Sequence, residues 1–395
     1  MNEKLYIVDT TGPFFVRHPK TLINWSKVPY ENLEKKGAFG KKTRKKIKGN
    51  FEKYIDKVAS LGFNAVSMDE LSRLVIFPFY PPELKTKLEQ YRRYYRRLFG
   101  IVKERGLKIF ITTDIMFHNP SIEAHTRGKR GRVPALLKEA LEILFIEFPE
   151  VDGVIFRMGE SDGVDVEGDF KSRLYIKTPA QANRCIKDLL PIFERYRKLM
   201  IFRTWTIGAH KVGDLMWNRK TYDRVFQGVH SARFIVSMKY GDSDFFRYLK
   251  LNSHFFNGPQ RKIIELQARR EYEGFGAFPS FTGWDYHEYY RLLQGIENLA
   301  GIHVWCQTGG WSRFRNFTFL KNTSPWNELN TVSTLKIFKD GCSVREAVSA
   351  WYRGERLNQL MKFLALSDQV VKWLLYDPAL SHRCLYFNRV RIPPL

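Results

Sequence analysis

The chain has 395 residues, enough for one large barrel with an appendage or for two ordinary domains. Hydrophobic residues make up 44% of it and aromatic residues 15%, which excludes a wholly disordered chain. The formal net charge of +24 favours an anionic partner, such as nucleic acid, an anionic membrane surface or an acidic glycan.

Short β-rich runs alternate with longer amphipathic stretches along most of the chain, a pattern typical of a parallel α/β fold. The predicted strands are Thr21–Ser26, Asn64–Met68, Lys108–Thr113, Gly153–Met158, Leu199–Trp205, Arg233–Met238, Lys262–Gln267 and Gly301–Trp305. The predicted helices between them are Phe51–Leu61, Leu84–Arg105, Pro134–Phe148, Pro179–Arg197 and Tyr286–Asn298. Eight such units predict a closed (β/α)₈ TIM barrel rather than an open sheet.

After Trp305 the alternation stops, and two helices are predicted at Arg345–Tyr352 and Glu355–Leu375. We therefore expect a barrel over residues 1–335 and a helical extension packed on it over residues 336–395. A doubly wound sheet lacks support, because the sequence has no phosphate loop and no Gly-x-Gly-x-x-Gly after a strand.

The sequence predicts no cofactor, no metal and no membrane span. The cysteines form no Cys-x-x-Cys pair, and no His-x-x-x-His or His-x-Asp pattern occurs among the nine histidines. No secretory signal precedes the barrel and no run of about 18 apolar residues exists, so we expect a cytoplasmic protein. The oligomeric state stays open.

Three acidic residues follow predicted strands, where the chemistry of a TIM barrel takes place. Glu160 follows the fourth strand, Asp244 the sixth and Glu271 the seventh. Cleavage of a glycosidic bond needs one carboxylic acid to protonate the leaving oxygen and a second carboxylate as base or nucleophile. The alternative for each residue is a helix cap or one half of an ion pair.

The segments Lys239–Phe245, Glu265–Gln267 and Arg270–Gly274 resemble the paired catalytic motifs of the α-glucuronidases of glycoside hydrolase family 67. The Glu-Ser-Asp-Gly segment at Glu160 and the segment Phe202–Trp205 resemble two further motifs of that family. The likeness covers roughly residues 153–274, with an Arg at position 270 where the family has Gln. The chain also has no room for the family's N-terminal β-domain.

This resemblance implies roles for five residues. Glu160 would be the general acid, and Asp244 and Glu271 would activate water in an inverting hydrolysis. Arg203 and Lys239 would bind the carboxylate of a uronic acid, as suits their charge. In the alternative, these two cations only neutralise nearby acids.

Two basic runs, Lys35–Lys48 and Arg127–Arg132, are predicted in strand-to-helix loops on the catalytic face. There they would concentrate an acidic polymer, although a solvated basic loop is the alternative. Trp205, Tyr240 and Trp311 are expected to stack on sugar rings, with ordinary packing as the alternative.

A different class of function also fits the charge: a basic, non-catalytic binding protein for nucleic acid or an anionic polysaccharide. No recognition-helix, RNP or zinc-finger pattern supports nucleic acid. The sequence therefore favours a glycosidase that acts on an acidic, uronic-acid-containing glycan.

Overall fold

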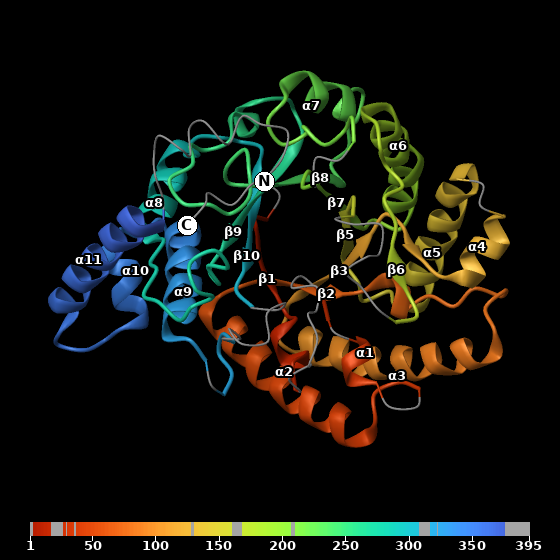
Figure 1. The fold of residues 1–395 in the computed structure, drawn as a ribbon, viewed down its shortest axis with the longest axis horizontal. Coiled ribbons are helices and arrows are strands. Elements are labelled where there is room, and N and C mark those ends of the chain that lie inside the picture. Colours follow the sequence, from red (N-terminus) through yellow and green to blue (C-terminus); the bar gives the residue numbers. More distant parts are fainter. Residues whose placement is uncertain are drawn as a thin grey trace.

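The computed structural model describes residues 3–16, 27–28, 30–34, 37–127, 130–159, 168–206, 210–307, 317–321 and 323–375. Eight parallel strands close into a barrel in the order β1-β10-β9-β8-β7-β5-β3-β2, with helices around it (Figure 1). The predicted (β/α)₈ TIM barrel is therefore confirmed.

The barrel strands are β1 (Leu5–Asp9), β2 (Ala65–Asp69), β3 (Lys108–Asp114), β5 (Gly153–Arg157), β7 (Leu199–Arg203), β8 (Phe234–Lys239), β9 (Arg261–Gln267) and β10 (Leu299–Trp305). The helices are α1 (Tyr30–Leu33), α2 (Lys41–Leu61), α3 (Pro82–Glu104), α4 (Pro120–Thr126), α5 (Val133–Glu147), α6 (Pro179–Arg195), α7 (Arg219–Phe226), α8 (Gly283–Leu292), α9 (Pro325–Asp340), α10 (Val344–Trp351) and α11 (Leu357–Leu375). Two short strands outside the barrel, β4 (Phe117–His118) and β6 (Lys171–Ser172), pair antiparallel.

Seven predicted strands lie within two residues of the observed ones at each end, but the prediction for the first strand is wrong. The first barrel strand is Leu5–Asp9, whereas Thr21–Ser26 lies outside the described residues. β1 pairs in parallel with both β2 and β10. A strand of a parallel barrel is covered on both faces, so a run of nearly continuous apolar residues such as that of β1 is its signature.

The interior of the barrel is apolar, whereas the end formed by the carboxyl ends of the strands, which we call the barrel mouth, is charged. Side chains of a strand alternate between its two faces, so every second residue points inward. The buried interior cluster consists of Leu5, Ile7, Ala65, Phe110, Ile155, Ile201, Ile235, Ile263 and Ala300. The same alternation, with a register shift in β10 between Leu299 and Gly301, gives the inward residues at the carboxyl ends of the strands as Asp9, Asp69, Asp114, Arg157, Arg203, Lys239, Gln267 and Trp305. All eight are buried, and we call them the strand-end ring.

The C-terminal helices pack beside the β9 and β10 side of the barrel (Figure 1). α9 runs on to Asp340, past the boundary expected at residue 335, and α10 and α11 follow it. A separate apolar cluster contains Phe281, which precedes α8, together with one residue from each C-terminal helix: Leu329 of α9, Val348 of α10 and Leu364 of α11. The extension therefore shares a core with the loop that precedes α8.

The basic run after β1 is mostly helical, which corrects the prediction of a loop. α2 begins at Lys41, so Lys41–Lys48 form its first two turns, and Lys35 and Lys36 lie outside the described residues. Lys41, Lys42 and Lys45 are exposed there. In the second run, Arg127 is the C-cap of α4, while Arg130–Arg132 form a 3₁₀ turn; residues 128–129 lie outside the described part.

Candidate active site

The acidic and the basic residues of the strand-end ring lie on different sides of the barrel mouth. Acids end three neighbouring strands, Asp9 on β1, Asp69 on β2 and Asp114 on β3. Basic residues end the next three, Arg157 on β5, Arg203 on β7 and Lys239 on β8. Because a buried charge is costly without a partner, the local pairing of each one decides what it can do.

Arg203 forms a buried bidentate ion pair with Glu265 of β9. Its Nε donates to Glu265 Oε1 at 2.8 Å, and its Nη2 donates to Oε2 at 2.6 Å. Ser237 Oγ also donates to Oε1 at 2.7 Å. Burial acts to raise the pKa of the Glu265 carboxyl, but Arg203 outweighs it and lowers this pKa to about 2. The structure thus favours the alternative for Arg203, in which it neutralises an acid.

Lys239 pairs with Asp244 in the loop after β8. Both side chains are buried, and Lys239 Nζ donates to Asp244 Oδ1. Tyr272 Oη donates to the other oxygen, Oδ2, at 2.6 Å, and the backbone N–H of Phe245 donates to Oδ1 at 2.8 Å. Burial acts to raise the pKa of the Asp244 carboxyl, but Lys239 and Tyr272 hold it below its usual value. Asp244 is therefore an anion with a fixed orientation.

Glu271 lies in the loop after β9, next to the phenol that contacts Asp244. Arg269 Nη2 donates to Glu271 Oε2 at 2.7 Å, and the Glu271 backbone N–H donates to Gln267 Oε1 at 3.0 Å. Burial, followed by the charges of Asp244 and Glu271, raises the pKa of the Tyr272 phenol. The two predicted residues therefore lie in loops that are in contact, because Tyr272, the residue after Glu271, donates to Asp244.

Asp69 and Asp114, which the sequence analysis missed, are two further carboxylates that both lie within 4.0 Å of the Arg157 guanidinium. Arg157 Nε lies 3.0 Å from Asp114 Oδ1, and Lys27 Nζ contacts Asp114 Oδ2. Burial acts to raise the pKa of Asp114, but Lys27 and Arg157 lower it well below its usual value. Asp69 accepts from the Val28 backbone N–H at 2.8 Å, and burial raises its pKa. Opposite shifts in two neighbouring acids are characteristic of acid–base sites.

Asp9 closes the ring between β1 and β10. Its Oδ1 accepts from the backbone N–H of Cys306 at 2.7 Å, and both its oxygens lie 3.3 Å from the N–H of Gln307. Burial raises the pKa of this carboxyl. We regard Asp9 as a structural link between the two strands.

The remaining predicted residues have different outcomes. Trp205 is partly buried, with Lys239 Nζ 3.2 Å from its ring centroid. Tyr240 is only 1% exposed and is stacked on Tyr289, so the prediction that its ring binds sugar is wrong. Glu160 and Trp311 lie outside the described residues.

The missed carboxylates share one signal. Asp9, Asp69 and Asp114 are each the last residue of an apolar strand, so the same rule that selected the acids after later strands applies to them. Tyr272 had no such signal, because its role depends on a loop that folds back towards β8.

The described residues offer neither a cluster of metal-binding side chains nor a membrane-spanning helix. Across the described ranges, no group of three or more His, Cys, Asp or Glu side chains is arranged to hold a metal ion. Within the same part of the chain, none of the helices combines the length and apolarity needed to cross a bilayer.

Neither a family model nor a curated protein matches the chain. Among solved structures, it is similar to a GH138 enzyme targeting pectin rhamnogalacturonan II, with a TM-score of 0.54, 11% identity, and 93% of this chain aligned to 42% of that one. A chitobiase of Flavobacterium johnsoniae gives a TM-score of 0.45 at 11% identity, with 83% of this chain aligned to 52% of that one.

A β-mannanase of the blue mussel Mytilus edulis gives a TM-score of 0.43 at 14% identity, with 78% of this chain aligned to 89% of that one. Glycoside hydrolases are thus among the structural neighbours of the chain. The chain spans less than half the length of the GH138 enzyme. At this identity the likeness establishes the barrel fold alone.

Proposed function

We propose that the chain is a glycoside hydrolase that acts on an acidic glycan. The observation that carries the proposal is the anion Asp244, buried at the barrel mouth and fixed by Lys239 and by Tyr272, the residue that follows Glu271. A carboxylate with a fixed orientation is what activation of a water molecule requires.

The proposed reaction is an inverting hydrolysis in the manner of the α-glucuronidases. A water oxygen attacks the anomeric carbon and loses a proton to Asp244 or Glu271. The glycosidic C–O bond breaks, and the leaving oxygen takes the proton of Glu160, which is the general acid. Arg203 and Lys239 would attract the substrate carboxylate through their positive charge at the barrel mouth. Trp205 and Trp311 are the proposed sugar contacts.

The first turns of α2 support an acidic substrate. Residues 41–51 include six basic side chains and no acid, and Lys41, Lys42 and Lys45 are exposed. Cations at a helix N-terminus are disfavoured by the helix dipole. An anionic polymer bound along this end would offset that cost and gain from the net charge of +24.

The test is hydrolysis of a panel of neutral and uronate-containing oligosaccharides by the wild type and by Glu160→Gln. We expect cleavage of uronate-containing members, and a loss of at least about a hundredfold in kcat for the variant, because its amide cannot donate a proton. Binding, measured by calorimetry, should stay within a few-fold.

Glu142→Gln is the matched control, since Glu142 pairs with Arg195 on the surface and should leave kcat unchanged. Unchanged turnover in Glu160→Gln would refute the assignment of the acid and direct attention to Asp69 and Asp114. Salt-sensitive binding of anionic polysaccharide or nucleic acid without any turnover would support the non-catalytic alternative.

A further inference from the structure

We propose that Asp368 of α11 is a positioning residue for the active site: it anchors, through Arg247 and Glu273, the two loops that carry Asp244 and Glu271. The effect that we expect on turnover rests on the proposed function, whereas the effect on the loops does not. The C-terminal helix would then be a component of the site.

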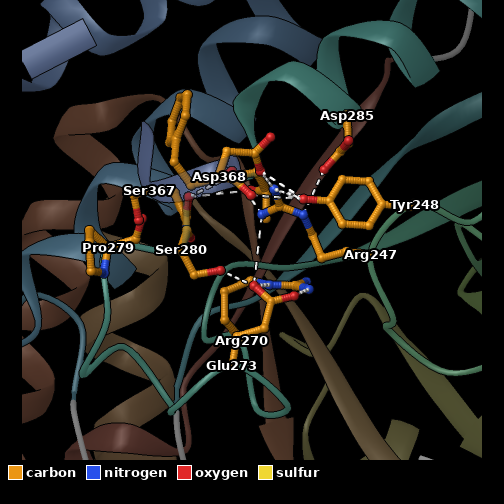
Figure 2. A network of polar contacts seen from close by, with 12 residues as sticks. Arg247, Tyr248, Arg270, Glu273, Pro279, Ser280, Asp285, Ser367 and Asp368 are labelled. Atoms are coloured by element: carbon orange, nitrogen blue, oxygen red, sulfur yellow. Dashed lines mark hydrogen bonds and ion pairs between the residues drawn. The ribbon is translucent and has the colours of Figure 1, made fainter. Parts of the chain in front are cut away.

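The anchor begins with Arg247, in the loop after β8, whose side chain is almost completely buried. Figure 2 shows its guanidinium between three carboxylates from different parts of the chain. Nε lies 2.8 Å from Asp285 Oδ2, Nη1 lies 3.8 Å from Glu273 Oε2, and Nη2 contacts Asp368 Oδ1. Burial acts to lower the pKa of Arg247, but Asp285 and Glu273 raise it, so the cation persists.

A second buried arginine carries the connection to the loop after β9. Arg270 is 1% exposed, and its Nε and Nη2 donate to the two oxygens of Glu273 at 3.1 and 2.5 Å. Nη2 also donates to the carbonyl oxygen of Phe245 at 3.2 Å. Arg270 therefore connects the loop after β9 with the residue that directly follows Asp244.

Arg270 also controls where the next two residues lie. Its φ of 49° is in the left-handed region, which is unfavourable for a residue with a Cβ and persists only where surrounding contacts hold it. Glu271 and Tyr272 follow immediately, and Tyr272 Oη contacts Asp244. A loss of the contacts around Arg270 would therefore release Tyr272 from Asp244.

α11 is fixed to the loops at more than one point, so Asp368 is held in place. Tyr248 Oη donates to Asp368 at 3.2 Å, and Ser367 Oγ donates to the carbonyl oxygen of Pro279 at 2.8 Å. Leu364, on the same helix, is fully buried in the apolar cluster with Phe281. Removal of the Asp368 charge would leave Arg247 with one fewer counter-charge inside the protein.

The experiment compares full-length wild type, Asp368→Asn, Asp368→Glu and the control Asp340→Asn by hydrogen–deuterium exchange and by turnover. Asp340 lies on α9, and within the described part of the chain its ion-pair partner is the nearby Lys336. In Asp368→Asn we expect amides of residues 241–250 and 268–282 to exchange at least about tenfold faster. Asp368→Glu should recover most of the protection, and the control should match the wild type.

Turnover separates positioning from stability alone. For the Asp368→Asn protein that remains folded, we expect kcat to fall about tenfold or more with KM within twofold, because the reacting groups rather than the substrate contacts are displaced. If this variant does not fold, Tyr248→Phe should give the same pattern with a smaller amplitude, because it removes the hydroxyl that contacts Asp368 Oδ1 and its backbone carbonyl but keeps the pair of Asp368 with Arg247.

Unchanged exchange in both loops would overturn the inference, as would faster exchange with unchanged kcat. If the wild type cleaves no glycan, the proposed function fails, and the exchange measurement alone decides whether Asp368 anchors the loops.

Discussion

Arg203→Met should lower the free energy of unfolding by about 3–5 kcal/mol, the usual result of removing one partner of a buried ion pair. Both side chains of the pair are almost fully buried, at 5% exposed for Arg203 and 1% for Glu265. Without the guanidinium, the Glu265 carboxylate would keep only Ser237 and Trp305 as donors. Urea denaturation followed by tryptophan fluorescence and circular dichroism measures the change.

A second substitution tests the cause of that loss. Glu265→Gln in the Arg203→Met background removes the unpaired charge and should recover a large part of the stability, since Gln still accepts from Ser237. The surface control is Arg195→Met, whose pair with Glu142 is exposed, so we expect less than about 1 kcal/mol. Equal losses in Arg203→Met and Arg195→Met would contradict the prediction.

Acidification should destabilise the protein already below about pH 6.5, before its carboxylates titrate. Burial lowers the pKa of His303 to about 3 and that of His254 to about 4. In the unfolded chain both rings bind a proton near pH 6.5, so the unfolded state takes up more protons as the pH falls. The stability from each neutral ring is complete above pH 6.5 and is lost progressively towards its folded pKa.

The expected slope is about 1.4 kcal/mol per pH unit for each ring, which amounts to several kcal/mol by pH 4. His303→Gln keeps a side chain beside Ser67, 3.0 Å from the imidazole Nε2, but does not titrate. The free energy of unfolding, measured from pH 8 to pH 4.5, should therefore fall less steeply in this variant. The exposed His230→Gln serves as control, and identical slopes in all three proteins would refute the prediction.

The strands of the barrel were predictable because each is a short β-rich run between longer amphipathic stretches. The exception, β1, is instructive. Leu5–Asp9 stands at the start of the chain without a preceding helix, so the alternation that located the other seven strands offered no guide there. Its apolar run and terminal Asp match those of β2 and β3, and that comparison would have located it.

The sequence could predict which acids of the candidate site follow strands, but not which side chains pair with them. The rule that chemistry follows strands selected Asp244 and Glu271, and Tyr272, the residue after Glu271, contacts Asp244. The partners of each charge depend on tertiary contacts: Arg203 and Glu265 are 62 positions apart, and Lys27 and Asp114 are 87 apart. Sequence spacing does not encode such pairs, and they decide which charges are neutralised within the protein.

The closure of the barrel has a consequence for how the chain folds. β1 pairs with β10 through Leu5 and Gly301, so the barrel closes only once segments about 300 residues apart meet. At a synthesis rate of about 5–20 residues per second, β1 would wait roughly 15–60 s for that partner. During this time β1 can pair with its native neighbour β2, but the edge that will meet β10 needs protection, for example from a chaperone. Folding of this barrel is therefore limited by its longest-range contact, and nascent chains that end before β10 are its aggregation-prone species.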